Sequence, residues 1–177
     1  MTDLVSLARE LSEAGGEADL PVEAWNPARC GAMDLTIRAD GAWVHEGREI
    51  TRASLVRLFS RVLRRDGDEY VLVTPAEKIT IEVEDAPFLL TDYDREGDVI
   101  VGLTNVGDPV RIGPDHPLVM RESAALGLAL PYVRVRGRLD ARLARAPYYR
   151  LVDEAEARDG RLVIRSGGAA FDLGEAA

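Results

Sequence analysis

Cysteine, lysine and histidine are scarce in this sequence, and their scarcity removes whole classes of functional site. Cys30 is the only cysteine, so a disulfide within one chain and a zinc site built from cysteines are both excluded. Lys78 is the only lysine. His45 and His116 are the only histidines, and neither an HExxH nor an HxH zinc pattern is present. A single cysteine suits a reducing compartment, so we expect a cytoplasmic protein.

Long hydrophobic runs and an excess of positive charge are missing as well. The most apolar stretch, residues 124–133, is interrupted by Gly127 and Pro131 and is far shorter than the roughly 20 residues of a membrane helix. The N-terminus has neither the basic start nor the long apolar core of a secretory signal. Acidic residues number 31 against 22 basic residues, for a net charge of −9. We therefore expect no nucleic-acid partner and no membrane partner.

The glycine-rich and serine-centred motifs of common enzymes are absent. No P-loop and no GxGxxG motif occurs, and neither Ser123 nor Ser166 lies in a GxSxG elbow. The pair Gly167-Gly168 is better explained as a hairpin turn. The sequence therefore implies no cofactor and carries no recognisable catalytic signature.

What the sequence does contain is ordinary globular composition, with 46% hydrophobic and 30% charged residues. Helical spacing of leucines predicts a short amphipathic helix at the N-terminus that ends at Gly15-Gly16. The clearest helix is predicted over about 51–65, with Thr51 as the N-cap and Asp66-Gly67 as the end. Its apolar stripe consists of Leu55, Leu58, Phe59, Val62 and Leu63.

The remainder reads mostly as β-structure. Asp40-Gly41 and Asp159-Gly160 predict hairpin turns. Strands are expected at 35–39, 42–44, 70–74, 79–83, 99–103, 110–112 and 132–135, with a final hairpin over 161–173. The fold class that follows is α+β, with mostly antiparallel sheets and one main helix.

Two stretches share turn landmarks and suggest an internal repeat. Residues 79–113 and 133–174 each contain a strand, an Ala-Pro-aromatic step, an acidic turn and a closing glycine. A duplication and a chance similarity of turn chemistry both explain this pattern. If the duplication is real, the chain has a helical segment at 1–20, a first α+β unit at 21–113 and a second at 114–177. These segments could also pack as one compact domain.

Several local patterns have a functional and a structural interpretation. The segment Asp92 to Asp98 resembles the start of a calcium loop, but Leu103 stands where a bidentate glutamate is needed, and a solvated acidic turn explains it better. Asp115-His116 lies between two prolines and is the most site-like dipeptide, although His116 in a structural turn is the simpler interpretation. Cys30 could act as a nucleophile with a histidine base, or pack as a small residue.

Two basic features have the same double interpretation. Arg134, Arg136 and Arg138 alternate along a predicted strand and so share a face, where they could bind an anion or pair with acidic residues of a neighbouring strand. Lys78 follows the turn at Thr74, and a contact between Glu77 and Lys78 would explain both residues.

Ordered segments along most of the chain carry a family resemblance. They are Trp25-Asn26-Pro27, Cys30-Gly31, Asp40-Gly41-Ala42-Trp43, Leu58-Phe59-Ser60, 72–78, 83–88, 104–108, 113–117, Pro131-Tyr132-Val133 and Ser166-Gly167-Gly168. With these segments the chain resembles a bacterial family of uncharacterised proteins, the domain of unknown function 1285. The resemblance implies an α+β fold with an internal repeat and a suggested part in signal transduction, but no catalytic residues.

The leading hypothesis is a non-catalytic regulatory module that binds a small ligand or a protein partner. Its candidate binding residues are Trp25, Asp34, Thr74, Glu77, Lys78, Asp85, Asn105, Asp108, Asp115 and His116. A second hypothesis is a small hydrolase that uses His116 with Asp108, Asp115 or a nearby glutamate as acid and base. A third is a structural homodimer, which would present a large apolar face on one sheet.

Overall fold

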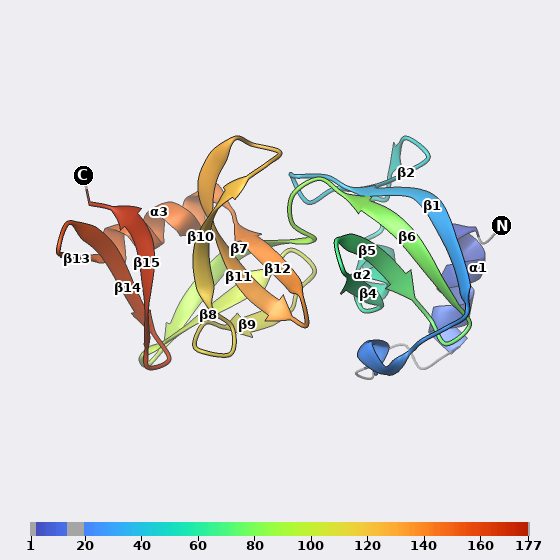
Figure 1. Ribbon diagram of the computed structural model, residues 1–177, viewed down its shortest axis with the longest axis horizontal. Helices are drawn as coiled ribbons and strands as arrows, with labels where there is room; N and C mark the ends of the chain where they lie inside the picture. Colours follow the sequence, from blue (N-terminus) through green and yellow to red (C-terminus); the bar gives the residue numbers. More distant parts are fainter. Residues whose placement is uncertain (1–2, 14–19, 177) are drawn as a thin grey trace. The chain divides into compact units, whose positions relative to one another are not determined.

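The computed structural model describes residues 3–13 and 20–176, and the chain divides into two compact units (Figure 1). The first unit is Met1–Glu84 and the second is Asp85–Ala177. The sequence placed this boundary near residue 113 instead. The difference arises because residues 88–111 form three strands that pair into the sheet of the second unit. None of the described helices is long and apolar enough to cross a membrane.

The first unit contains one six-stranded sheet with helices beside it. Its elements in order are α1 (Leu4–Glu13), the 3-10 helix η1 (Val22–Ala24), β1 (Arg29–Ile37), β2 (Trp43–His45), β3 (Arg48–Glu49), α2 (Ala53–Ser60), β4 (Leu63–Asp66), β5 (Glu69–Val73) and β6 (Glu77–Val83). The strand order is β3-β2-β1-β6-β5-β4. Only the central pair β1/β6 is parallel. The predicted end of the first helix at Gly15-Gly16 lies outside the described residues.

The second unit contains a six-stranded and a three-stranded sheet. Its elements are β7 (Phe88–Glu96), β8 (Val99–Thr104), β9 (Pro109–Arg111), β10 (Leu118–Ser123), β11 (Leu128–Arg136), β12 (Leu139–Leu143), α3 (Arg145–Glu154), β13 (Glu156–Arg158), β14 (Arg161–Ser166) and β15 (Ala169–Glu175). The larger sheet has the order β10-β11-β12-β7-β8-β9, and the smaller has the order β13-β14-β15. Again one pair is parallel, β12/β7 at the centre.

The two six-stranded sheets have the same topology. Each consists of two three-stranded meanders whose first and last strands pair in parallel at the centre. The α+β class and the two tandem related units are therefore confirmed. The predicted repeat matched the strand at 79–83 with the strand at 133–135. In the structure, β6 corresponds by its position in the sheet to β12 instead. The second Ala-Pro-aromatic step lies inside α3, not before a strand.

The main predicted helix is shorter than expected. α2 covers Ala53–Ser60, its N-cap is Arg52 and not Thr51, and Leu63–Asp66 is the strand β4. Leu63 pairs with Leu72 of β5, and it is 1% exposed. A short apolar run fits a helix or a buried strand, and here cross-strand pairing decides. Asp66-Gly67 begins the turn between β4 and β5, where Gly67 has a φ of +60°.

Alternating side chains bury one face of each sheet. Leu35 and Ile37 of β1 are almost fully buried, as their alternation predicts. In the first unit Trp43 stacks on Phe59 of α2, with ring centroids 6.5 Å apart. In the second unit Leu90 of β7 lies so close over Gly102 that a Cβ there would be 2.2 Å from a leucine methyl. Any larger residue at position 102 of β8 would therefore displace the buried Leu90 side chain.

The β14–β15 hairpin is attached to the larger sheet at its tip (Figure 1). The buried Ser166 hydroxyl accepts a hydrogen bond from the Ile100 amide at 2.8 Å and donates one to the Ile112 carbonyl at 2.6 Å. The next residue, Gly167, has a φ of +57°, and a Cβ there would lie 3.1 Å from the Ile112 oxygen. Gly167-Gly168 therefore forms the predicted hairpin turn and also allows a close approach between two backbones.

Replacing Ser166 with alanine should destabilise the second unit. Ser166→Ala leaves a buried amide and a buried carbonyl without a partner, and we expect a loss of about 2 to 4 kcal/mol in the free energy of unfolding. Urea denaturation of the purified variant measures it. Thr91→Ala, on an exposed position of β7, should change the same quantity by less than about 1 kcal/mol. Equal effects of the two substitutions would contradict the role given to Ser166.

Candidate functional site

The ten residues predicted from sequence divide equally between the two units. The first unit holds Trp25, Asp34, Thr74, Glu77 and Lys78, and the second holds Asp85, Asn105, Asp108, Asp115 and His116. We describe the two sets separately and ask what each side chain contacts.

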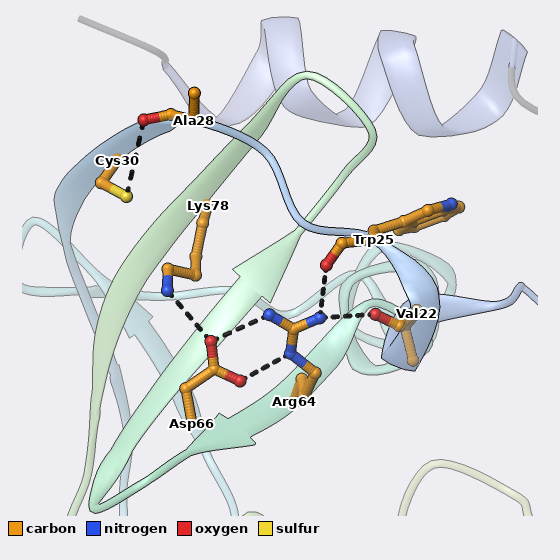
Figure 2. Close-up of polar contacts among 7 residues, drawn as sticks. All are labelled: Val22, Trp25, Ala28, Cys30, Arg64, Asp66 and Lys78. Atoms are coloured by element: carbon orange, nitrogen blue, oxygen red, sulfur yellow. Dashed lines mark hydrogen bonds and ion pairs between the residues drawn. The ribbon is translucent and has the colours of Figure 1, made fainter.

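In the first unit, a residue that the sequence did not single out organises the surroundings of Trp25 and Lys78 (Figure 2). Arg64 of β4 is 7% exposed and forms a two-pronged contact with Asp66, at 2.6 and 2.8 Å. Its third nitrogen donates to the carbonyl oxygens of Val22 and Trp25, each at 2.7 Å. Lys78 reaches the same Asp66 carboxylate at 3.0 Å. Arg64 thus ties the segment around Trp25 to β4.

The charges of this cluster stabilise one another. The hydrogen bonds from Arg64 are the largest cause that lowers the pKa of the Asp66 carboxyl, burial opposes them, and Lys78 lowers the pKa further. The same hydrogen bond raises the pKa of the Arg64 guanidinium. Both oxygens of the Asp66 carboxylate are bonded to Arg64 or Lys78, so this carboxylate offers little to a ligand. We interpret this cluster as structural.

The other predicted residues of the first unit also have partners within the fold. The Thr74 hydroxyl accepts hydrogen bonds from the amides of Ala76 and Glu77, which closes the turn before β6. Glu77 is 5% exposed and lies 3.6 Å from Arg29, and Lys78 pairs with Asp66, so the predicted contact between Glu77 and Lys78 is not what holds this turn.

Asp34 and Cys30 lie on β1. The Asp34 carbonyl oxygen accepts from the His45 ring at 2.8 Å, while its carboxylate belongs to an exposed residue. Cys30 is exposed, and its sulfur lies 4.0 Å from the Ala28 oxygen (Figure 2). Neither histidine forms a hydrogen bond with this thiol within the described part of the chain. The structure therefore gives no support for a cysteine nucleophile with a histidine base.

In the second unit, Asp85 is the centre of a buried polar network. Its side chain is 5% exposed and accepts from Ser123 at 2.6 Å, Tyr132 at 2.7 Å and Arg142 at 2.9 Å. Burial is the main cause that raises the pKa of the Tyr132 hydroxyl. All the contacts of Asp85 join the start of the unit to β10, β11 and β12. Asp85 is therefore an internal anchor, although it was predicted as a binding residue.

Arg134 of β11 follows the structural interpretation, whereas Arg138 lies beyond the end of this strand. Arg134 lies opposite Asp140 of β12 and donates to it at 2.6 Å, and Arg121 of β10 contacts the other oxygen at 2.7 Å. The Arg121 guanidinium also lies 3.8 Å from the centroid of the Tyr132 ring. Cross-strand pairing therefore accounts for Arg134, as expected for a charged row on a sheet.

Asn105 and Asp108 shape the turn between β8 and β9. The Asn105 side-chain oxygen accepts from the backbone amide of Leu89 at 3.0 Å, and the backbone amide of Asn105 donates to the Leu89 carbonyl oxygen at 2.8 Å. The Asp108 amide donates to the Thr104 hydroxyl at 2.9 Å. Both residues thus hold backbone in place, as turn residues commonly do.

The acidic segment 92–98 is a strand followed by a tight turn. β7 continues to Glu96, so Asp92, Asp94 and Glu96 lie on one face of the strand, with about 7 Å between each residue and the next. Asp92 pairs with Arg150 of α3, and a hydrogen bond from the Tyr93 amide is the largest cause that lowers its pKa. This strand geometry differs from the tight loop that a calcium site requires. The described residues contain no group of three His, Cys, Asp or Glu side chains suited to a metal ion.

Asp115 and His116 lie in a groove of the second unit. The groove has a volume of about 670 Å³, and its floor is the outer face of β7, β8 and β9. One wall is the Gly113–Pro117 loop, and Gly167 of the hairpin tip completes the lining on the same side. Its polar side chains are Glu96, Arg111, Asp115 and His116. Its apolar side chains are Val99, Val101, Pro109, Ile112 and Pro114.

Backbone hydrogen bonds hold His116 in a defined orientation. The amides of Gly113 and His116 each donate to the carbonyl of the other, at 3.2 and 3.1 Å, which closes the loop. The ring Nδ1 lies 2.9 Å from the carbonyl oxygen of Arg134. Since a carbonyl only accepts, Nδ1 carries the proton, and Nε2 of the neutral ring is a hydrogen-bond acceptor. Within the described residues Nε2 has no hydrogen-bond partner.

Arg111 and Glu96 complete the groove and were missed by sequence reasoning. They form an ion pair across β8, and both side chains are more than half exposed. The sequence does contain their charges, at the end of β7 and at the end of β9, on either side of the apolar strand β8. This signal could not be used without the strand register.

The Asp66 cluster predicts a pH dependence of stability. Because the pKa of Asp66 is lowered in the folded protein, its contribution is present above the unfolded pKa of about 3.9 and is lost as the pH falls through the folded pKa. The free energy of unfolding of the unmodified protein should fall between about pH 5 and pH 2, and we expect a smaller fall for Asp66→Asn. Urea denaturation at a series of pH values tests this, with the exposed Asp68→Asn as the matched control. Parallel curves for Asp66→Asn and the unmodified protein would contradict it.

Comparison with known proteins agrees with the division of the chain. The family model described as Domain of unknown function (DUF1285), N-terminal domain, matches residues 20–86. The model described as Protein of unknown function (DUF1285), C-terminal domain, matches residues 87–173. The boundary between the two matches lies within two residues of the boundary between the compact units. A search of curated proteins found no match.

Two solved structures resemble this chain. A DUF1285 family protein from Silicibacter pomeroyi DSS-3 is 38% identical, with a TM-score of 0.91 over 99% of this chain and 97% of that chain. A DUF1285 family protein from Shewanella baltica OS155 is 30% identical, with a TM-score of 0.55 over 69% of this chain and 92% of that chain. With both family models matched in order along the chain, this protein belongs to the DUF1285 family.

Proposed function

We propose that this protein is a non-catalytic binding module and that its ligand binds in the groove beside the Gly113–Pro117 loop. The observation that carries the proposal is the oriented imidazole of His116, whose Nε2 has no hydrogen-bond partner among the described residues, at the wall of a groove of about 670 Å³. A volume of this size lies within the range of roughly 300 to 1,000 Å³ that ligand pockets occupy.

The composition of the groove supports binding. Polar side chains at the rim can fix the orientation of a ligand, while apolar side chains supply contact area. The other predicted residues have hydrogen bonds or ion pairs within the fold or lie outside the groove lining. The loop is closed by its own hydrogen bonds, so little conformational entropy would be lost when a ligand binds.

The arrangement around His116 favours binding over hydrolysis. A histidine that serves as general base is commonly oriented by a carboxylate on one nitrogen and faces a nucleophile with the other. Here a backbone carbonyl occupies Nδ1, and among the described residues no hydroxyl or thiol lies within hydrogen-bond distance of Nε2. Of the aspartates proposed as its partner in the hydrolase hypothesis, Asp108 is not part of the groove lining, and Asp115 lines the groove but has no hydrogen bond to His116 among the described residues. A regulatory role would then depend on what the groove binds.

A thermal-shift screen tests the proposal, and the chain supplies a matched control. His45 and His116 both bond a backbone carbonyl through Nδ1, at 2.8 and 2.9 Å, but only His116 lines the groove. A ligand at a hundred times its dissociation constant should stabilise the protein by about 2.7 kcal/mol. We expect His116→Ala to abolish the stabilisation by a screening hit and His45→Ala to retain it.

The same screen defines the contrary result. Metals, nucleotides, cyclic dinucleotides, amines and common metabolites form the panel, and the two variants are tested against each hit. Hits that stabilise both variants equally would place the ligand outside the groove and overturn the proposal. Turnover of a hit that is lost in His116→Ala would replace it with the hydrolase hypothesis.

A further inference from the structure

Acceptor side chains outnumber donor side chains in the groove. Asp115 presents a carboxylate, Glu96 presents the carboxylate oxygen that is not bonded to Arg111, and His116 presents Nε2 as an acceptor. Arg111 is the only side chain of the lining with donors left for a ligand, and one of its nitrogens donates to Glu96. Because two carboxylates face one guanidinium, the groove favours a cation that donates hydrogen bonds.

An ammonium group suits these acceptors better than a guanidinium group. An ammonium carries three donors that point in different directions, whereas the donors of a guanidinium lie in one plane and match one carboxylate at a time. The acceptors of the groove come from two separate segments, namely the end of β7 at Glu96 and the loop that carries Asp115 and His116. This separation favours a compact cation over a planar one.

The apolar part of the groove suits an alkyl chain. Val99 and Val101 of β8 are half-buried and lie in one row, since residues two apart share a face of the strand. Pro109 and Pro114 flank this row, and Ile112 lies beneath the loop with 1% of its surface exposed. An aliphatic stem can lie along such a row while its charged end stays at the rim.

We propose that the groove binds an alkylammonium group on an apolar stem, such as a lysine side chain of a partner polypeptide. The inference rests on the proposed function, because it names the ligand class of the same groove. The protein itself carries one lysine, Lys78, which is paired with Asp66 in the first unit. A free aliphatic diamine has the same chemistry, and the experiment separates the two sources.

Amide NMR titration with three small probes tests the ligand class. The probes are N-acetyl-lysine methylamide, its norleucine analogue without the ammonium, and its arginine analogue. We expect the lysine probe to shift the amide signals of residues 99–101 and 113–116, with weaker effects of the arginine probe and none of the norleucine probe. An equal response to the norleucine probe would overturn the inference, because the ammonium would then contribute nothing.

Matched variants separate a site from the general attraction of an acidic protein for cations. Asp115→Asn and Glu96→Gln each remove one charge from the groove. Glu82→Gln removes one charge from a different hollow of about 360 Å³ in the first unit, which Glu69, Glu82 and Glu84 line without a histidine. We expect Asp115→Asn to weaken binding of the lysine probe by about tenfold, as for the loss of a charged hydrogen bond. Equal weakening by Glu82→Gln would overturn the site.

Two further arms identify the source of the amine and keep the two proposals distinguishable. A lysine-centred pentapeptide that binds more tightly than 1,5-diaminopentane indicates a polypeptide partner, and the reverse order indicates a free amine; both orders support the alkylammonium class.

If the lysine probe fails while another compound binds in a manner that depends on His116, the binding function stands and this inference falls. If no probe or screened compound perturbs residues 113–116, both fall.

Discussion

Each six-stranded sheet depends on a parallel pairing between its first and its last strand in chain order. β1 pairs with β6 in the first unit, and β7 pairs with β12 in the second. Without this pair, each six-stranded sheet would separate into two three-stranded meanders with unpaired inner edges. The pairing therefore makes each unit indivisible. It also explains why the compact units and the two family matches divide the chain at nearly the same residue.

The two copies differ in the segment that connects their meanders. In the first unit this connection contains α2, which buries Phe59 against Trp43. In the second unit it is the Gly113–Pro117 loop, which is too short to form a helix, and the chain adds α3 and a three-stranded sheet after the sixth strand. Ser166 and Gly167 attach that added sheet next to the loop. The groove follows from this difference. In the second unit the connecting loop and the hairpin tip form one side of the groove, whereas the corresponding connection in the first unit contains a helix.

Most of the polar residues predicted as a site serve the backbone instead. Thr74 and Asn105 close turns, and Asp85 is held by three side chains in a buried network. Sequence reasoning could not separate these roles, because the side chains that satisfy backbone amides in turns are the same ones that bind ligands. Arg64 escaped attention because it fell within the helix predicted over about 51–65 and outside the apolar stripe of that helix.

The sequence by itself determined the α+β class, the alternation that buries one face of each strand, the hairpin turns and the family, because these depend on neighbouring residues and on ordered segments. It also indicated Asp115-His116 as the most site-like dipeptide, with a structural turn as the simpler interpretation. Only the tertiary structure decided the boundary between the units, the end of α2 and the lining of the groove. Strand register brings Glu96 and Arg111 together across β8, and no local pattern encodes which strands become neighbours.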